Sequence, residues 1–340
     1  MYPGATRLRR RSRKNGATIL ALCLMAVGCG SPQTNPTAQT IAPTNAKPAI
    51  KITNVWVFVS DPGSAQVFIY TLPRLKLVEI ATGFKQPQGE CSDSKGDVWV
   101  TDGAAKTIYE LEHSGKIVQQ LSDTTGSPIG CAWDPRTGNL AVMNFLGSNS
   151  QGGAVLVYHH ATGRPNLYYN PKQFNYEFGG YDGAGDLFFD GLSSVGKFML
   201  SELAANSAEA KTVKVSGGKL YTPGMVQWNS SANDLVVGDQ NCENVTASCV
   251  YGMTIVENGA TIVGQTKLEN AGGGQVCDMI QGALWKKSIV GSDFDFCGSG
   301  PSATYVWSYP DGGKPHSTNS HNVSQPFGAA ISVRPNGASP

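Results

Sequence analysis

Short apolar segments that end in Asp or Asn recur along the chain and form its main pattern. They are Trp56–Asp61, Val98–Asp102, Leu140–Asn144, Leu187–Asp190, Leu235–Asp239 and Ile289–Asp293. The terminal residues are separated by 41, 42, 46, 49 and 54 positions. Recurrence at this spacing is typical of propellers, in which each repeat builds one four-stranded blade. We therefore expect an all-β fold, a six-bladed β-propeller, rather than an irregular β-sandwich.

A second motif precedes several of these segments. Pro87-Gln-Gly89 leads to Asp93–Gly96, and Pro128-Ile-Gly130 leads to Asp134–Gly138. Asp, Asn and Gly favour tight turns because they tolerate left-handed backbone and bond to nearby backbone groups. Each motif therefore predicts a short strand, then a turn, then the apolar segment.

The first unit starts directly at Trp56 and lacks this preceding strand. A matching stretch, Pro326–Val333, occurs near the other end of the chain. A C-terminal strand that completes the first blade would close the ring and remove two exposed sheet edges. We expect the propeller to occupy residues 50–337.

The sequence Pro-x-Gly, Asp-x-x-Gly, Val-x-Val-x-Asp resembles NHL-type propellers and the wider six-bladed group that contains the SMP-30/gluconolactonase lactonases. The resemblance covers about residues 50–337, and Gln86–Leu121 is the best match. It implies a metal-dependent lactonase or hydrolase as one candidate function. Those enzymes carry Asn and Asp in the middle of Pro-x-Gly-like motifs, whereas this chain has Gln88, Ile129 and Phe327.

The first 28 residues are typical of a secretory signal. A basic stretch precedes the short apolar run 17–28, and Cys29 follows. Ala26-Val27-Gly28-Cys29 resembles a bacterial lipobox, which implies a lipid on Cys29; an ordinary secretory signal is the alternative. Residues 29–49 are rich in Pro, Thr, Gln and Ala, which predicts a disordered tether. We therefore expect a lipoprotein held by its lipid at the periplasmic face or outer membrane of a bacterium.

Charge narrows the class of partner. All six basic residues of the first 28 precede the apolar run, and the rest of the chain carries 20 Lys and Arg against 25 Asp and Glu, a net charge of −5. An acidic body is unsuited to nucleic-acid backbones. We expect a monomer whose partner beyond the membrane is an envelope protein or a glycan.

Six cysteines remain after Cys23 and Cys29. They are Cys91, Cys131, Cys242, Cys249, Cys277 and Cys297. An even number in an exported chain favours three disulfides, and a Cys242–Cys249 bond would close one hairpin. Buried thiols or metal ligands are the alternative, although the chain has no Cys-x-x-Cys.

Oxygen-bearing side chains are predicted at one mouth of the central channel. They are Glu90, Asn144, Asp61, Asp102, Asp190, Asp239 and Asp293. Oxygen ligands suit Ca²⁺, so a calcium site is one interpretation. The other is that each Asp or Asn caps its own loop through backbone N–H groups.

No familiar catalytic motif is present, neither His-Glu-x-x-His nor Gly-x-Ser-x-Gly. The five histidines, among them His113 and His159, fall in polar turns and are expected to be solvated. The sequence thus favours a non-catalytic binding or scaffold module of the cell envelope. The alternatives are the metal-dependent lactonase and a purely structural envelope protein.

Overall fold

The computed structural model describes residues 55–148, 152–257, 259–294 and 301–334. The chain divides into residues 1–51 and residues 52–340, and everything described belongs to the second unit. The predicted signal, Cys29 and the tether lie outside the described residues. No helix among the described residues is long and apolar enough to cross a membrane.

The described residues form an all-β, propeller-like fold. Four sheets have four strands each: β24 (Ala329–Val333), β1 (Val55–Asp61), β2 (Gln66–Thr71) and β3 (Leu77–Ala81); β4 (Pro87–Ser92), β5 (Val98–Asp102), β6 (Thr107–Leu111) and β7 (Ile117–Ser122); β8 (Gly126–Trp133), β9 (Leu140–Gly147), β10 (Val155–Tyr158) and β11 (Asn166–Tyr168); β20 (Ala283–Trp285), β21 (Ser288–Asp293), β22 (Ala303–Ser308) and β23 (Ser317–Asn319). Two short 3-10 helices are η2 (His159–Ala161) and η3 (Cys242–Asn244).

The fifth sheet has eight strands in two antiparallel halves. Its strands are β12 (Gly179–Tyr181), β13 (Leu187–Leu192), β14 (Phe198–Leu203), β15 (Lys211–Ser216), β16 (Val226–Asn229), β17 (Asp234–Asp239), β18 (Cys249–Val256) and β19 (Gly259–Lys267). The halves join where Lys214–Ser216 of β15 pairs in parallel with Gly259–Thr261 of β19. Within each half, neighbouring strands are antiparallel.

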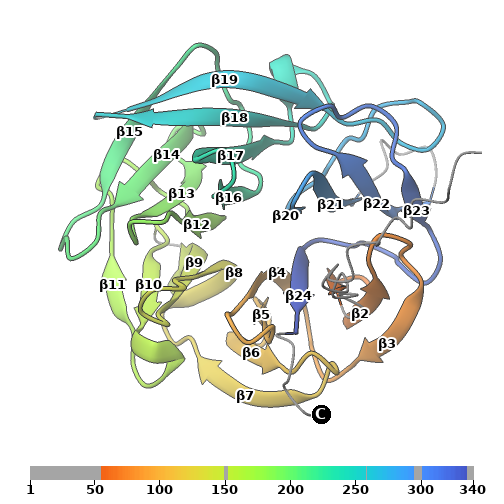
Figure 1. The fold of residues 1–340 in the computed structure, drawn as a ribbon. Helices are drawn as coiled ribbons and strands as arrows, with labels where there is room; N and C mark the ends of the chain where they lie inside the picture. The colour runs from red at the N-terminus through yellow and green to blue at the C-terminus, as the bar shows by residue number, and fades with distance from the viewer. Residues whose placement is uncertain (1–54, 149–151, 258, 295–300, 335–340) are drawn as a thin grey trace, which may run out of the picture. The chain divides into compact units, whose positions relative to one another are not determined.

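The sheets surround a common centre (Figure 1). The innermost strands β4, β8, β12, β16, β20 and β24 contact one another in succession, and β24 contacts β4 to close the cycle. The closing strand predicted from Pro326–Val333 is confirmed, because β24 pairs antiparallel with β1 and places Ala330 opposite Phe58. The two ends of the described chain therefore share one sheet.

The glycines of the Pro-x-Gly motifs allow neighbouring innermost strands to approach closely. A Cβ atom on Gly89 would lie 2.3 Å from the carbonyl oxygen of Ile129, and one on Gly130 would lie 2.1 Å from that of Glu177. Any larger residue would clash with backbone, which cannot move aside cheaply. The motif is therefore a packing requirement of the ring.

The hydrophobic core lies between neighbouring sheets. Val98–Asp102 of β5 is buried along its whole length. Val98 and Val100 pack with Phe58 and Ile69 of the first sheet, while Trp99, on the opposite face, packs with side chains of the third sheet such as Leu140. A strand buried on both faces reads as a continuous apolar run, which is why these segments stand out in the sequence.

Candidate functional site

The turns after the innermost strands lie at one end of the central axis, which we call the turn side. The loops that lead into the innermost strands lie at the other end, the loop side. All the predicted oxygen ligands except Glu90 belong to second strands, toward the loop side, and the carboxylates among them accept hydrogen bonds from backbone N–H groups. The carboxylate of Asp102 accepts hydrogen bonds from the backbone N–H groups of Lys85, Gln86 and Ala105 at 2.7, 3.0 and 2.8 Å.

The other predicted carboxylates at the loop side follow the same scheme. The backbone N–H donors are Ser64, Ser324 and Gln325 to Asp61; Phe178 and Gly224 to Asp190; Tyr221, Thr222 and Asn241 to Asp239; and Asp278 to Asp293. Asn144 instead donates from its side-chain amide to the Thr125 hydroxyl at 3.0 Å. Except at Asn144, the geometry is that of loop capping, in which backbone amides supply the positive charge that a cation would otherwise provide.

A metal-competent cluster does occur, but at another place. Among the described residues, Asp93, Asp97 and Glu110 form the one group of three possible ligands whose atoms lie within 4.8 Å of each other. Burial first, and then the neighbouring carboxylates, raise the pKa of Asp97 and of Glu110. Asp93 already accepts hydrogen bonds from the backbone N–H groups of Lys95 and Asp97, so part of this cluster serves the turn.

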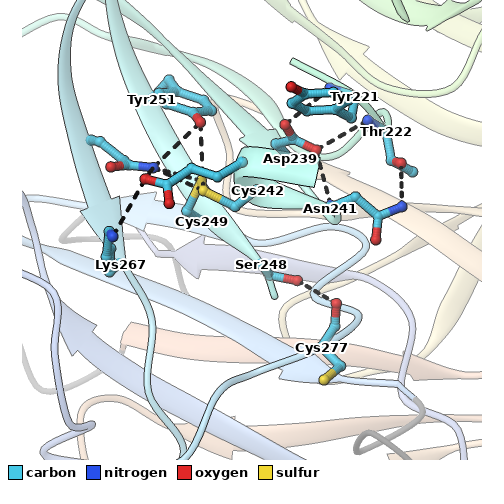
Figure 2. Close-up of a disulfide and its surroundings, with 12 residues drawn as sticks. Tyr221, Thr222, Asp239, Asn241, Cys242, Ser248, Cys249, Tyr251, Lys267 and Cys277 are labelled. Carbon is cyan, nitrogen blue, oxygen red and sulfur yellow. Dashed lines mark hydrogen bonds and ion pairs between the residues drawn. A yellow bond between two sulfur atoms is a disulfide. The ribbon is translucent and has the colours of Figure 1, made fainter. Parts of the chain in front are cut away.

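Two disulfides connect described cysteines. The predicted Cys242–Cys249 bond is confirmed and clamps the loop that follows β17. Figure 2 shows this loop beside the Asp239 cap, and Lys267 forms an ion pair at 3.4 Å with Glu243 in the loop. The second bond joins Cys91 of β4 to Cys131 of β8, two neighbouring innermost strands.

The remaining two cysteines are only partly described. Cys277 is also disulfide-bonded, and its backbone carbonyl accepts a hydrogen bond at 2.8 Å from the hydroxyl of Ser248 (Figure 2). Cys297 lies outside the described residues. Because the other four described cysteines pair with one another, the bonded state of Cys277 supports the predicted third disulfide, while its pairing stays a prediction.

The expectation that His113 is solvated is wrong. Its side chain is 4% exposed, stacks on Trp56 with ring centroids 3.9 Å apart, and bonds through Nδ1 to the Ser332 hydroxyl at 2.6 Å. Burial, and then the nearby charge of Arg334, lower the pKa of His113 to about 4. The turn sequence suggested exposure, but β1 and β24 cover this turn.

A cavity of about 760 Å³ opens on the turn side and is lined by all the innermost strands and by the turns after β4, β8, β12, β16 and β20. We call it the turn-side cavity. Its wall is built of small residues such as Gly180, Gly282 and Ala329, which leave the centre unfilled. Its lining includes Glu90, but none of the other predicted oxygen ligands.

Aromatic side chains form part of the rim of the turn-side cavity. Trp133, Tyr181 and Trp285 are the last residues of β8, β12 and β20, and Trp228 is the last but one of β16. All four line the cavity and are half-buried. The sequence analysis missed the three tryptophans. Each lies at the last or next-to-last position of an innermost strand, so the repeats place a tryptophan just before the turn in three sheets.

Glu90 is the buried acid in this wall. It is 2% exposed, and neither carboxyl oxygen has a hydrogen-bond partner in the described chain. Burial raises the pKa of Glu90 well above its usual value, and the Ala330 amide, which approaches without completing a hydrogen bond, offsets this only in part. Gln281 binds the backbone N–H and C=O of Glu90 at 2.7 and 2.9 Å, so the strand is fixed while the carboxyl group is not.

Aromatic rings pack at the loop side. Phe178, Phe294 and Phe327 lie in or beside one hydrophobic cluster with Ile129, and the Phe327 ring is 6.3 Å from Phe178 and 6.1 Å from Phe294. Phe178 comes directly before β12, and Phe327 comes two residues before β24. This packing therefore lies where the loops converge. Side chains therefore fill the loop side while the turn side has room for a ligand.

No protein-family model matches the chain, and no curated protein sequence matches it. Among solved structures it is similar to a chain of a nidogen/laminin complex, with 12% identity and a TM-score of 0.64, over 82% of this chain and 98% of that chain. It is also similar to a protein of unknown function from Bacteroides caccae, with 13% identity and a TM-score of 0.61, over 82% of this chain and 99% of that chain. At these identities the likeness shows the fold alone, and that fold is propeller-like and all-β.

Proposed function

We propose that this protein is a lipid-anchored, non-catalytic binding module of the bacterial cell envelope and that it holds its ligand in the turn-side cavity. The observation that carries the proposal is the cavity itself, about 760 Å³ in volume and rimmed by half-buried aromatic side chains. Small-molecule sites are commonly concave, of roughly 300–1,000 Å³, and rich in aromatic surface with a few polar groups. Rigid aromatic rings provide contact area at little entropic cost.

The scaffold of this module is proposed to have six blades. The eight-stranded sheet then contains two of them, β12–β15 and β16–β19, fused where β15 pairs with β19. In support of this count, each half is internally antiparallel and supplies one innermost strand, β12 or β16, to the closed cycle.

The metal-dependent lactonase has less support. Carboxylates at the loop side are already bonded to backbone amides, as at Asp102 and Asp239. The metal-competent group of the described residues shares Asp93 with the lining of the turn-side cavity, but Asp93 already accepts hydrogen bonds from the backbone N–H groups of Lys95 and Asp97. The geometry therefore favours binding over metal-assisted hydrolysis.

The test is a thermal-shift survey of the purified protein against amines, sugars, carboxylates and nucleosides. A ligand at 100 times its Kd stabilises the folded state by about 2.7 kcal/mol, which is readily measured as a rise in Tm. We expect Trp285→Ala and Trp133→Ala to abolish the shift. Tyr169→Ala is the matched control, since Tyr169 is 52% exposed and does not line the cavity. Shifts that both rim variants leave unchanged would place the ligand elsewhere.

A further inference from the structure

The turn-side cavity has an excess of negative charge. Asp93 and Asp182 line it against one basic residue, Lys286, and Glu90 adds a third carboxyl group, whose neutral form burial favours until a cation approaches. Carboxylates in a concave, partly desolvated wall reinforce one another and focus their potential on the space that they enclose. Anionic ligands are therefore disfavoured in this cavity, and cations are favoured.

The rim already holds one cation on an indole ring. The Lys286 ammonium lies 5.3 Å from the ring centroid of Trp285, within the range of a cation–π interaction. Trp133, Trp228 and Tyr181 also line this cavity, while part of each ring packs against the core and Trp228 stacks on Phe188. The quadrupole of such rings attracts positive charge at their faces.

The carboxyl group of Glu90 is a hydrogen-bond acceptor of the site that has no partner in the described chain. The side-chain amide oxygens that line the cavity, which could accept from the hydroxyls of a sugar, are engaged within the protein. The Gln281 amide bonds to the backbone of Glu90 at both ends, Gln227 accepts from the backbone N–H of Leu284 at 2.6 Å, and Asn229 accepts from the Ser231 hydroxyl at 2.7 Å. The oxygens of Glu90 have no partner in the described chain, and a buried acceptor left unmatched is costly.

From these observations we infer that the turn-side cavity binds a small organic cation, an amine or a quaternary ammonium, between its aromatic rim and Glu90 as counter-charge; the inference rests on the proposed binding function. The Glu90 oxygens are shielded from water in this structure, so direct contact requires rotation of that side chain toward the cavity. A cation beside the group favours its ionised form, which burial alone disfavours.

The experiment is isothermal titration of the purified protein with choline and with 3,3-dimethylbutan-1-ol, which has the same shape without the charge. We expect choline to bind about tenfold more tightly than the alcohol, the size of a desolvated cation–π and charge contribution. Glu90→Gln should weaken choline binding about tenfold and leave the alcohol unaffected. Glu177→Gln is the matched control, because Glu177 is a buried carboxyl group outside the cavity lining whose pKa burial raises to about 7.

The outcomes separate this inference from the binding function itself. If the alcohol binds as tightly as choline, or if sugars or other neutral ligands bind while choline does not, the cation inference is wrong and the binding function stands. If no ligand binds in the cavity, both fail. Should Glu90→Gln not fold, the preference of the unaltered protein for choline over the alcohol still decides the question.

Discussion

A single carboxylate on each second strand except β9, which carries Asn144, holds much of the loop side together. Asp102 ties the loop before β4 to the turn after β5, and Asp239 does the same for the loop before β16. Hydrogen bonds to a charged acceptor contribute about 1.5–3 kcal/mol each. Asp recurs because it caps loops in its own part of the ring. The residues that suggest calcium ligands in sequence are therefore not clustered in space.

His113 shows where reasoning from single residues fails. It lies in a turn, and turns are ordinarily exposed, but its covering residues Trp56 and Ser332 are far away in sequence. Its burial follows from the pairing of distant strands, which no local pattern contains.

The pH dependence of stability should carry the signature of His113. Its pKa is about 4 in the folded protein and 6.5 when unperturbed. Between these values the unfolded chain binds a proton that the folded protein does not, so the contribution of His113 to stability is full above pH 6.5 and is lost as the pH falls toward 4. We expect His113→Gln to flatten the pH dependence of the free energy of unfolding in this window. Urea unfolding from pH 4 to 7 measures it, with the exposed His159→Gln as control; equal slopes in all three proteins would contradict this.

The short strand β24 completes the first sheet and closes the cycle of innermost strands. Ala329, Ala330 and Ser332 of this strand are buried, and it lies between β1 and the innermost strand β4. Without it, β1 would present a bare edge next to the axis, and exposed edges promote association.

Truncation tests the role of β24. A chain that ends at Gly328 should lose its cooperative unfolding transition or show a Tm lower by at least about 10 °C, since several kcal/mol of packing and pairing are removed. A chain that ends at Arg334 keeps β24 and is the matched control. A synthetic peptide of residues 326–334 should restore stability to the shorter chain. An unchanged Tm at Gly328 would show that the sheet does not depend on this strand.

Much of the fold was predictable from sequence, because each repeated motif occupies an equivalent packing position in its sheet. The second strands are buried on both faces, the Pro-x-Gly glycines meet neighbouring backbone, and the displaced C-terminal strand pairs with β1 as expected. The fusion of β15 with β19 was not predictable, because the meeting of two outer edges depends on loop paths that carry no pattern.

The location of the cavity was less accessible to sequence reasoning. A repeat shows which positions are equivalent, but not which end of the axis its side chains fill. Here Phe178, Phe294 and Phe327 pack at the loop side, whereas glycines and alanines leave the turn side open. Of the predicted ligands, Glu90 alone lines that opening.

The proposed membrane attachment concerns the whole chain, and we propose that it depends on a lipid at Cys29. We expect Cys29→Ser to move the protein from the membrane fraction to the soluble or precursor form, because the predicted tether without acyl chains has no stable hold on a bilayer. Cys23→Ser, which changes a cysteine within the apolar run, is the matched control and should leave attachment intact. Detergent-phase partitioning of cell fractions measures both, and a Cys29→Ser protein that still partitions with detergent would disprove lipidation at this residue.

The pairing of β1 with β24 also sets an order in time. The first described strand, β1, emerges from the ribosome nearly the whole described chain earlier than its partner β24. Contacts of such long sequence separation form slowly, because a large loop must close before they are rewarded. During synthesis the other sheets can therefore form from neighbouring segments as they emerge, while the first sheet made is the last to be completed.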